Sequence, residues 1–302
     1  MERIIIQEEI NERIDSYLSK NTDYSRSKIV KMLANNSILV NEKAVKNSYT
    51  LKVGDVITIG EYKEEDMSID PENIPLDIVY EDEDVIVVNK PNGMVVHPAI
   101  GNNHGTLVNA LLYHSKKLSD INGEFRPGIV HRIDAETTGL LMVAKNNKAH
   151  EILADELSKK ETTRKYVALV WGVIKEDTAT IDAPIGRDSN DRKKMAVTSI
   201  NSKDAITHLR VLKRYKDATL IELSLETGRT HQIRVHMNYI EHPVVNDPVY
   251  GRRKRIDETG QCLHAKTIGF VHPVTQKYME FTSELPECFL NILNIFENDI
   301  EK

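Results

Sequence analysis

Three side chains capable of acid–base or ionic chemistry lie within four residues of one another, at His131, Arg132 and Asp134. A Thr-Thr-Gly turn at residues 137–139 follows, and the apolar run 140–144 then predicts a buried strand. A charged loop fixed to a rigid strand is a place where catalytic groups tend to lie. The alternative is a surface loop with a local arginine–aspartate pair. On the residues alone, both interpretations stay open.

Two later segments could bring further groups to this loop. Residues 164–172 predict a strand in which Tyr166 alternates with its neighbours, although a tyrosine there can also be a plain core residue with a satisfied hydroxyl. Residues 219–225 predict another strand, and Arg229 follows its end, where it could meet a carboxylate. The next residues, 233–237, alternate between apolar and charged side chains, but a helix is equally open.

The segment HRIDAETTGLLMVAK, at residues 131–145, resembles the signature loop of the RluA-type pseudouridine synthases. These enzymes convert uridine to pseudouridine in structured RNA. The sequence departs from the usual loop at Ile133 and Ala135, which leaves the carboxylate and the turn intact and bears on substrate choice. Further motifs match in the same order, so that the resemblance covers most of the chain: VNKP at 88–91, VVHP at 95–98, RKY at 164–166 and ETGRTHQIRVH at 226–236.

The resemblance implies a role for three residues. Asp134 would be the catalytic carboxylate, attacking the flipped uridine or stabilising positive charge at its sugar, because a carboxylate can do either at an anomeric carbon. Tyr166 would stack on the uracil, and Arg229 would pair with Asp134 and keep it ionised. Whether Asp134 bonds to the sugar or first removes a proton is left open. Glu136, two residues further on, is expected to lie outside the site.

The reaction rearranges one base without redox change or group transfer, so no cofactor is expected. The chain accordingly has neither a dinucleotide-binding glycine motif nor a Walker loop. A metal site is also not expected. His97 and His104 lack a third ligand at suitable spacing, and His231 and His236 are five residues apart, unlike the zinc-helix spacing. His208 is expected to be structural.

The chain carries 40 Lys and Arg against 46 Asp and Glu, so RNA binding depends on where the basic residues cluster. Such clusters occur on an N-terminal helix, in the signature loop, and in the segments 186–194 and 250–255. Phosphate contacts are expected from these clusters, although solvated surface positions are the usual alternative. The candidate RNA-binding residues are Arg26, Lys28, Lys31, Arg132, Arg192, Lys193, Arg252 and Arg253.

The pattern predicts two domains with an α+β fold. Residues 11–60 predict two helices, the second capped by Ser25, followed by short strands, and they resemble the alpha-L RNA-binding fold named after a small-subunit ribosomal protein. Residues 61–75 are acidic and contain two prolines, which predicts a mobile linker that stays off the RNA. Residues 76–298 would form the catalytic domain, with a mixed and largely antiparallel sheet.

At 302 residues with two cysteines, the chain predicts neither a disulfide framework nor a zinc knuckle, and it has no run of about 20 apolar residues. A cytoplasmic protein is expected, with a monomer favoured. The resemblance is strongest to the RluD-like branch, which implies large-subunit ribosomal RNA, or its precursor particle, as the partner. Two alternatives stay open: a non-catalytic ribosome-assembly factor, and a sugar-cleaving hydrolase that needs a second essential carboxylate.

Overall fold

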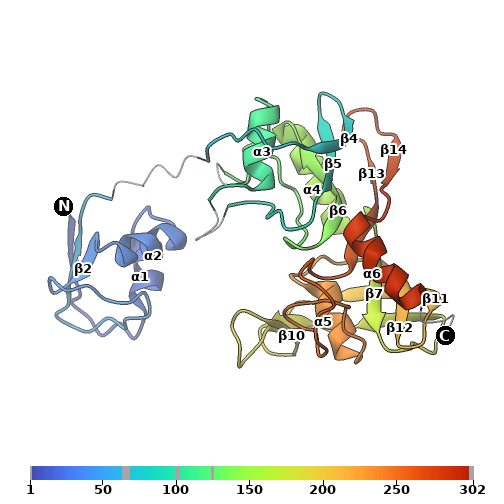
Figure 1. The fold of residues 1–302 in the computed structure, drawn as a ribbon. Helices are drawn as coiled ribbons and strands as arrows, with labels where there is room; N and C mark the ends of the chain where they lie inside the picture. Colours follow the sequence, from blue (N-terminus) through green and yellow to red (C-terminus); the bar gives the residue numbers. More distant parts are fainter. Residues whose placement is uncertain (1, 63–68, 99–102, 124–125, 299–302) are drawn as a thin grey trace. The chain divides into compact units, whose positions relative to one another are not determined.

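The computed structural model describes residues 2–62, 69–98, 103–123 and 126–298. The chain divides into two compact units, residues 1–67 and 68–302 (Figure 1). Part of the predicted linker, residues 63–68, lies outside the described residues, as does the segment 99–102 of the loop that follows the VVHP motif.

The small unit consists of two helices and a three-stranded antiparallel sheet in the order β1-β3-β2. Strand β1 pairs with β3, so the unit begins before residue 11, where the sequence prediction began it. The elements are β1 (Glu2–Ile5), α1 (Ile14–Asn21), α2 (Arg26–Ala34), β2 (Ile38–Val40) and β3 (Val56–Ile59).

Local sequence explains how the small unit closes. The Ser25 hydroxyl accepts a hydrogen bond from the backbone N–H of Lys28, which caps α2 as predicted. Leu18 of α1 and Ile29 of α2 are fully buried and pack with Ile57 of β3 in one hydrophobic cluster. The unit therefore has its own core, and its helices keep one face in solvent.

The second half of the predicted linker packs onto the large unit. Ile69 contacts the main hydrophobic core, and the Glu72 N–H donates to the Asn109 carbonyl oxygen at 2.9 Å. The Asn109 side chain in turn donates to the Asp70 carbonyl oxygen at 2.8 Å. Residues 69–75 thus belong to the large unit rather than to a linker, because their backbone groups are satisfied there.

The large unit is built on a nine-stranded sheet with the order β4-β5-β6-β13-β7-β12-β11-β8, and β14 pairs with β13. Among the described strands, β6 and β13 form the one parallel pair, so the predicted mixed, largely antiparallel α+β fold is confirmed. A separate hairpin joins β9 and β10. The elements are β4 (Asp77–Glu81), β5 (Val85–Lys90), α3 (Leu107–His114), β6 (Thr138–Ala144), α4 (Asn147–Lys159), β7 (Thr163–Trp171), β8 (Thr178–Asp182), β9 (Ile185–Arg187), β10 (Met195–Val197), β11 (Ile206–Arg214), β12 (Ala218–Leu225), α5 (Gln232–Tyr239), β13 (Leu263–Val271), β14 (Tyr278–Thr282) and α6 (Glu287–Asn298).

Helices cover both faces of this sheet. Because successive strand side chains point to opposite faces, Val88 of β5 packs in the cluster that includes α3 and α5, whereas Val87 packs with Leu153 of α4. Helix α6 packs over β7 through Phe289 and Phe296. The central strands are therefore buried on both faces, which explains their continuous apolar sequences.

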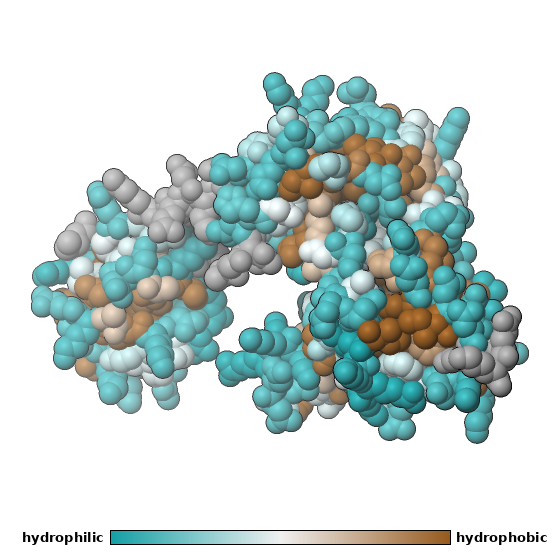
Figure 2. Space-filling view, viewed as in Figure 1, coloured by the Kyte–Doolittle hydropathy of each residue, from teal (hydrophilic) through white to brown (hydrophobic). Residues whose placement is uncertain are grey.

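The surface of the molecule is mainly polar. In Figure 2 most of the visible face is hydrophilic, with separate hydrophobic areas, and the exposed apolar residues include Leu290 and Ile295 of α6. No helix in the described parts of the chain has both the length and the apolar character needed to cross a bilayer.

Candidate active site

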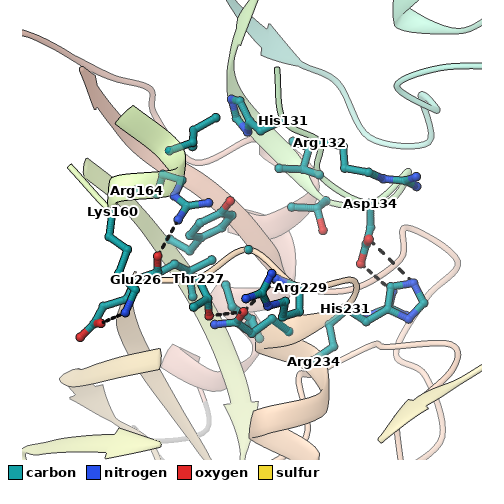
Figure 3. Close-up of a pocket in the computed structure, with 18 of the residues that line it drawn as sticks. His131, Arg132, Asp134, Lys160, Arg164, Glu226, Thr227, Arg229, His231 and Arg234 are labelled. Carbon is teal, nitrogen blue, oxygen red and sulfur yellow. Dashed lines mark hydrogen bonds and ion pairs between the residues drawn. The ribbon is translucent and has the colours of Figure 1, made fainter. Parts of the chain in front are cut away.

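A pocket of about 440 Å³ opens in the large unit beside the signature loop (Figure 3). One wall is the loop 130–137, which precedes β6. The opposite wall comes from Arg164 and Tyr166 of β7 and from the C-terminal end of α4. The turn between β12 and α5, residues 226–231, closes the pocket. Segments distant in the sequence thus meet around Asp134.

The loop that carries Asp134 is fixed from several sides. The Thr137 N–H donates to the Asp134 carbonyl oxygen at 3.1 Å, which closes a turn. The buried ammonium of Lys90 donates to the Ala135 carbonyl oxygen at 2.7 Å. Gly139, with φ of +107°, lies so close to β13 that a Cβ would meet the Ala265 carbonyl oxygen. These contacts set the position of Asp134 before any ligand arrives.

The Lys90 side chain is almost completely buried, and no carboxylate among the described residues lies within hydrogen-bond distance of its ammonium. Burial lowers its pKa to about 7, and the negative charge of Asp134 opposes that shift. Its ammonium also donates to the Pro91 carbonyl oxygen at 2.8 Å. The lysine of the VNKP motif therefore anchors the catalytic loop.

Asp134 is held by an arginine that the sequence analysis did not choose. Arg234 donates through Nη1 to Asp134 Oδ2 at 2.8 Å, and through Nε and Nη2 to both oxygens of the buried Asp247 at 2.7 and 2.9 Å. The bidentate bonds and the charge of Arg234 outweigh the effect of burial and lower the pKa of Asp247. The charges of Asp247 and Asp134 raise the pKa of Arg234 against the effect of burial.

The prediction that Arg229 pairs with Asp134 is therefore wrong. Arg229 lines the pocket, but its Nε donates to the Asp204 carbonyl oxygen at 2.9 Å. It lies in the turn before α5, whereas the helix presents Arg234 to the carboxylate. The sequence analysis left a helix open over 233–237, and Arg234 lies in the first turn of the helix that forms there, at 232–239.

His231 is the second side chain near the carboxylate. Its Nε2 lies 3.8 Å from Asp134 Oδ1 (Figure 3). Its Nδ1 lies 2.8 Å from the Tyr250 hydroxyl. The backbone of His231 is left-handed, with φ of +56°, which is uncommon for a residue other than glycine. The Tyr250 oxygen also accepts from the Met195 N–H of β10 at 2.9 Å. A polar chain thus links the β9–β10 hairpin to Asp134.

Tyr166 lies on β7 with its side chain toward the pocket, and it is only 7% exposed. Burial raises its pKa; Arg164 lowers it and Asp134 raises it further. No group among the described residues hydrogen-bonds its hydroxyl, in contrast to a satisfied core tyrosine. Because Tyr166 lines the pocket, its ring can contact a ligand that lies beside Asp134.

His131 of the signature loop has a structural role. Its Nε2 accepts the Met142 N–H at 3.1 Å, so this nitrogen carries no proton. Burial and the charge of Arg164 lower the pKa of His131 to about 3. A neutral imidazole thus fixes the loop to β6. His208, expected to be structural, lies 2.8 Å from Glu226, and Glu136 does not line the pocket.

The candidate RNA-binding residues are distributed over both units. Arg132 alone lines the pocket, and its Nη1 lies 3.3 Å from His97. The others lie outside this pocket, on surfaces of their own unit. Arg26 pairs with Asp15, Lys28 lies over the Tyr24 ring, Lys31 is on α2, Arg192 and Lys193 are exposed between β9 and β10, Arg252 bonds Asn238, and Arg253 stacks on Trp171.

The described residues offer a group of three potential metal ligands, Asp82, Asp84 and His272, but it lies outside the pocket. Asp82 already accepts from the Tyr80 hydroxyl and two backbone N–H groups, and lies 2.7 Å from His272. Neither His97 nor His104 belongs to this group. The groups around Asp134 are therefore suited to ionic and stacking interactions with an organic ligand.

Comparison with known proteins agrees with this geometry. The family model described as RNA pseudouridylate synthase matches residues 84–239, and the S4 domain model matches residues 12–57. The chain is 54% identical to an uncharacterized RNA pseudouridine synthase of Bacillus subtilis, over 95% of each chain. It is 39% identical to ribosomal large subunit pseudouridine synthase D of Escherichia coli, over 99% of this chain and 94% of the relative.

A solved structure agrees as well. Human RNA pseudouridylate synthase domain containing 1 superposes with a TM-score of 0.57 and 28% identity, covering 77% of this chain and 89% of that one. The matched family segment contains Asp134, Tyr166 and Arg234, so it spans both walls of the pocket. The chain therefore belongs to the RNA pseudouridylate synthase family and is an enzyme that isomerises uridine to pseudouridine in RNA.

Proposed function

We propose that this enzyme acts on large-subunit ribosomal RNA, with Asp134 as its catalytic carboxylate. Relatives at 39–43% identity over nearly the full length are named for that substrate. The observation that carries the role of Asp134 is its position: an ion-paired carboxylate in a pocket that Tyr166 also lines. The proposal includes a cytoplasmic location, where ribosomal RNA is found in bacteria, and action as a monomer.

The reaction breaks the bond between N1 of the base and C1′ of the sugar and forms a bond from C1′ to C5. The C5 proton leaves and N1 is protonated, so atoms balance without a co-reactant. The target uridine must leave its stack, at a cost of a few kcal/mol. Stacking on Tyr166 offsets part of that cost, because aromatic side chains hold unpaired bases.

Asp134 attacks the extruded nucleoside or stabilises positive charge at its sugar carbon. Arg234 keeps the carboxylate in place and ionised, since the opposite charge lies at hydrogen-bond distance. Because Asp247 binds the other edge of that guanidinium, Arg234 cannot turn away from Asp134 without breaking two further bonds. This pairing replaces the role first given to Arg229.

The pocket also suits an anionic polymer. Arg132, Arg164 and Arg229 line it without an ion pair among the described residues. Asp134 shares the positive charge of Arg234 with Asp247. Polyanions bind where positive charge gathers, and phosphate contacts fix the position of RNA without reading its sequence. The substrate's backbone is therefore expected to run along these arginines.

The test uses ribosomal RNA from cells that lack this protein. Pseudouridines are mapped before and after incubation with the wild-type chain or with Asp134→Ala, and transfer RNA serves as a parallel substrate pool. The proposal expects the wild type to restore defined sites in large-subunit RNA, and the variant to bind but restore none. Restoration in transfer RNA alone would contradict the substrate assignment. Activity of the variant would contradict the role of Asp134.

A further inference from the structure

Arg164 is a buried cation whose hydrogen-bonding capacity is only partly used. It lies on β7, two residues before Tyr166, and is 9% exposed. Its Nη2 donates to the Glu226 carbonyl oxygen at 3.1 Å, while its buried Nε has no hydrogen-bond partner in the described residues. Leaving a charged donor buried and unmatched is costly, so such a group in a folded protein calls for an explanation.

No carboxylate of the described residues forms an ion pair with Arg164. Two carboxylates line the pocket: Asp134, which is bound by Arg234, and Glu226, which bonds Lys160 at 2.8 Å and lies 2.8 Å from His208. The second cation of this region is Arg229. Burial lowers the pKa of Arg164; Tyr166 opposes this shift and the charge of Arg229 adds to it. The described protein residues thus gather two positive charges without an anion.

The lack of a side chain at position 228 leaves room for the Arg164 guanidinium. Gly228 precedes Arg229, and a Cβ at Gly228 would lie 2.7 Å from Nη1 of Arg164. Arg164 and Tyr166 point to the same face of β7, about 7 Å apart along the strand. An anion at Arg164 would therefore lie beside a base stacked on Tyr166 and not on top of it.

We propose that Arg164 and Arg229 form a binding site for a phosphodiester group adjacent to the uridine that is held at Asp134. The inference rests on the proposed function, which supplies a nucleotide to this pocket. The planar guanidinium with several parallel donors matches the oxygens of a phosphodiester. The ligand is the sugar–phosphate backbone of the substrate itself. Arg229, which does not pair with Asp134, is the second arginine that binds this phosphodiester.

The experiment measures binding of small probes to the full-length chain by ligand-observed NMR at low salt. The probes are uridine, uridine with a methyl phosphodiester at O5′, uridine with the same group at O3′, and inorganic phosphate. One of the two diesters should bind roughly 10-fold to 100-fold more tightly than uridine, as expected for charged hydrogen bonds. Equal affinity of uridine and both diesters for the wild-type chain would overturn the proposal without the use of any variant.

Variants then locate the site. Arg164→Gln should remove the preference for the diester and leave the affinity for uridine unchanged, whereas Arg210→Gln, an exposed arginine of β11 outside this pocket, should keep the preference. Gly228→Ala provides a second route, because it retains Arg164 and displaces the end of its guanidinium. Thermal melting confirms that each variant is folded. Equal loss in Arg210→Gln, or inorganic phosphate binding as tightly as the diester, would overturn the assignment.

This test separates the inference from the proposed function, because binding of these probes requires no isomerisation. If the wild type fails to modify ribosomal RNA but retains a diester preference that depends on Arg164, the proposed substrate is wrong and the phosphodiester site stands. If the wild type modifies ribosomal RNA but shows no diester preference, the phosphodiester site is wrong and the proposed substrate stands.

Discussion

The two walls of the pocket differ in how their charged side chains are paired. On one side Asp134 and Asp247 share the guanidinium of Arg234, with bonds of 2.7–2.9 Å. Arg164 and Arg229 instead donate to backbone carbonyl oxygens and are in no ion pair among the described residues. We call the first group the carboxylate wall and the second the arginine wall. The carboxylate wall holds its charges through bonds within the protein, whereas the arginine wall leaves two cations for the proposed phosphodiester.

The largest effect is expected on the carboxylate wall. Asp134→Asn removes the negative charge but keeps the size of the side chain, so the rate of pseudouridine formation should fall at least about a thousandfold. Single-turnover measurements with saturating enzyme check this, since they separate chemistry from RNA binding. A decrease below tenfold would show that another group acts on the nucleoside.

The two arginines of the same motif provide a matched pair. Arg234→Gln leaves the buried Asp247 without its counter-charge, so the free energy of unfolding should fall by about 3–5 kcal/mol. Arg229→Gln should change it by less than about 0.5 kcal/mol, because Arg229 is in no ion pair among the described residues. Urea denaturation of both variants measures the difference. Similar decreases in the free energy of unfolding for both variants would contradict the difference between the two walls.

Arg164 of the arginine wall should also affect how the free energy of unfolding depends on pH. Burial and the charge of Arg164 lower the pKa of His131 to about 3, below the value of about 6.5 in the unfolded chain. Between these two pH values, His131 binds a proton in the unfolded state but not in the folded state. The free energy of unfolding therefore decreases as the pH falls below about 6.5. At pH 5 this amounts to at most about 2 kcal/mol.

In Arg164→Gln one cause of that shift is removed, so folded His131 binds its proton at a higher pH and the loss of stability between pH 5 and 3 should be smaller than in the wild type. Urea denaturation at both pH values, with Arg210→Gln as the control, measures this. An unchanged loss in Arg164→Gln would show that burial alone sets the pKa of His131.

The smallest effect concerns salt. Each phosphate contact adds about 1 to the slope of log affinity against log salt concentration, so Arg229→Gln should reduce that slope by about 1. Asp134→Asn removes no cation from the arginine wall and should leave the slope unchanged within error. RNA binding titrated over a range of salt concentrations provides the comparison. A slope unchanged in Arg229→Gln would remove Arg229 from the phosphate contacts.

Short-range patterns in the sequence were sufficient for most of the framework. The strands β6 and β7 and the Ser25 cap of α2 follow from apolar runs and a local hydrogen-bonding residue, and the structure confirms them. The parallel pairing of β6 with β13 joins residues more than 120 positions apart, and no local pattern encodes it. The strand β1 was missed for the same reason, because its partner β3 lies 50 residues away.

The site shows the same limit. Asp134 and Tyr166 could be chosen from their motifs, and both line the pocket. The partner of Asp134 could not, because two arginines of one motif were available and the choice depends on whether 232–239 forms a helix. Arg164 was passed over because a buried cation without a carboxylate has no signature in the sequence. Burial and pairing are properties of the fold.

Gly139 has a consequence for how this enzyme could be redesigned. It joins the loop to β13 through main-chain atoms, at a point where any side chain would collide with Ala265. The location of Asp134 is thus specified by this backbone contact together with the Lys90 and His131 side chains. Position 139 accepts glycine alone, so a redesign of the loop has to leave this residue unchanged.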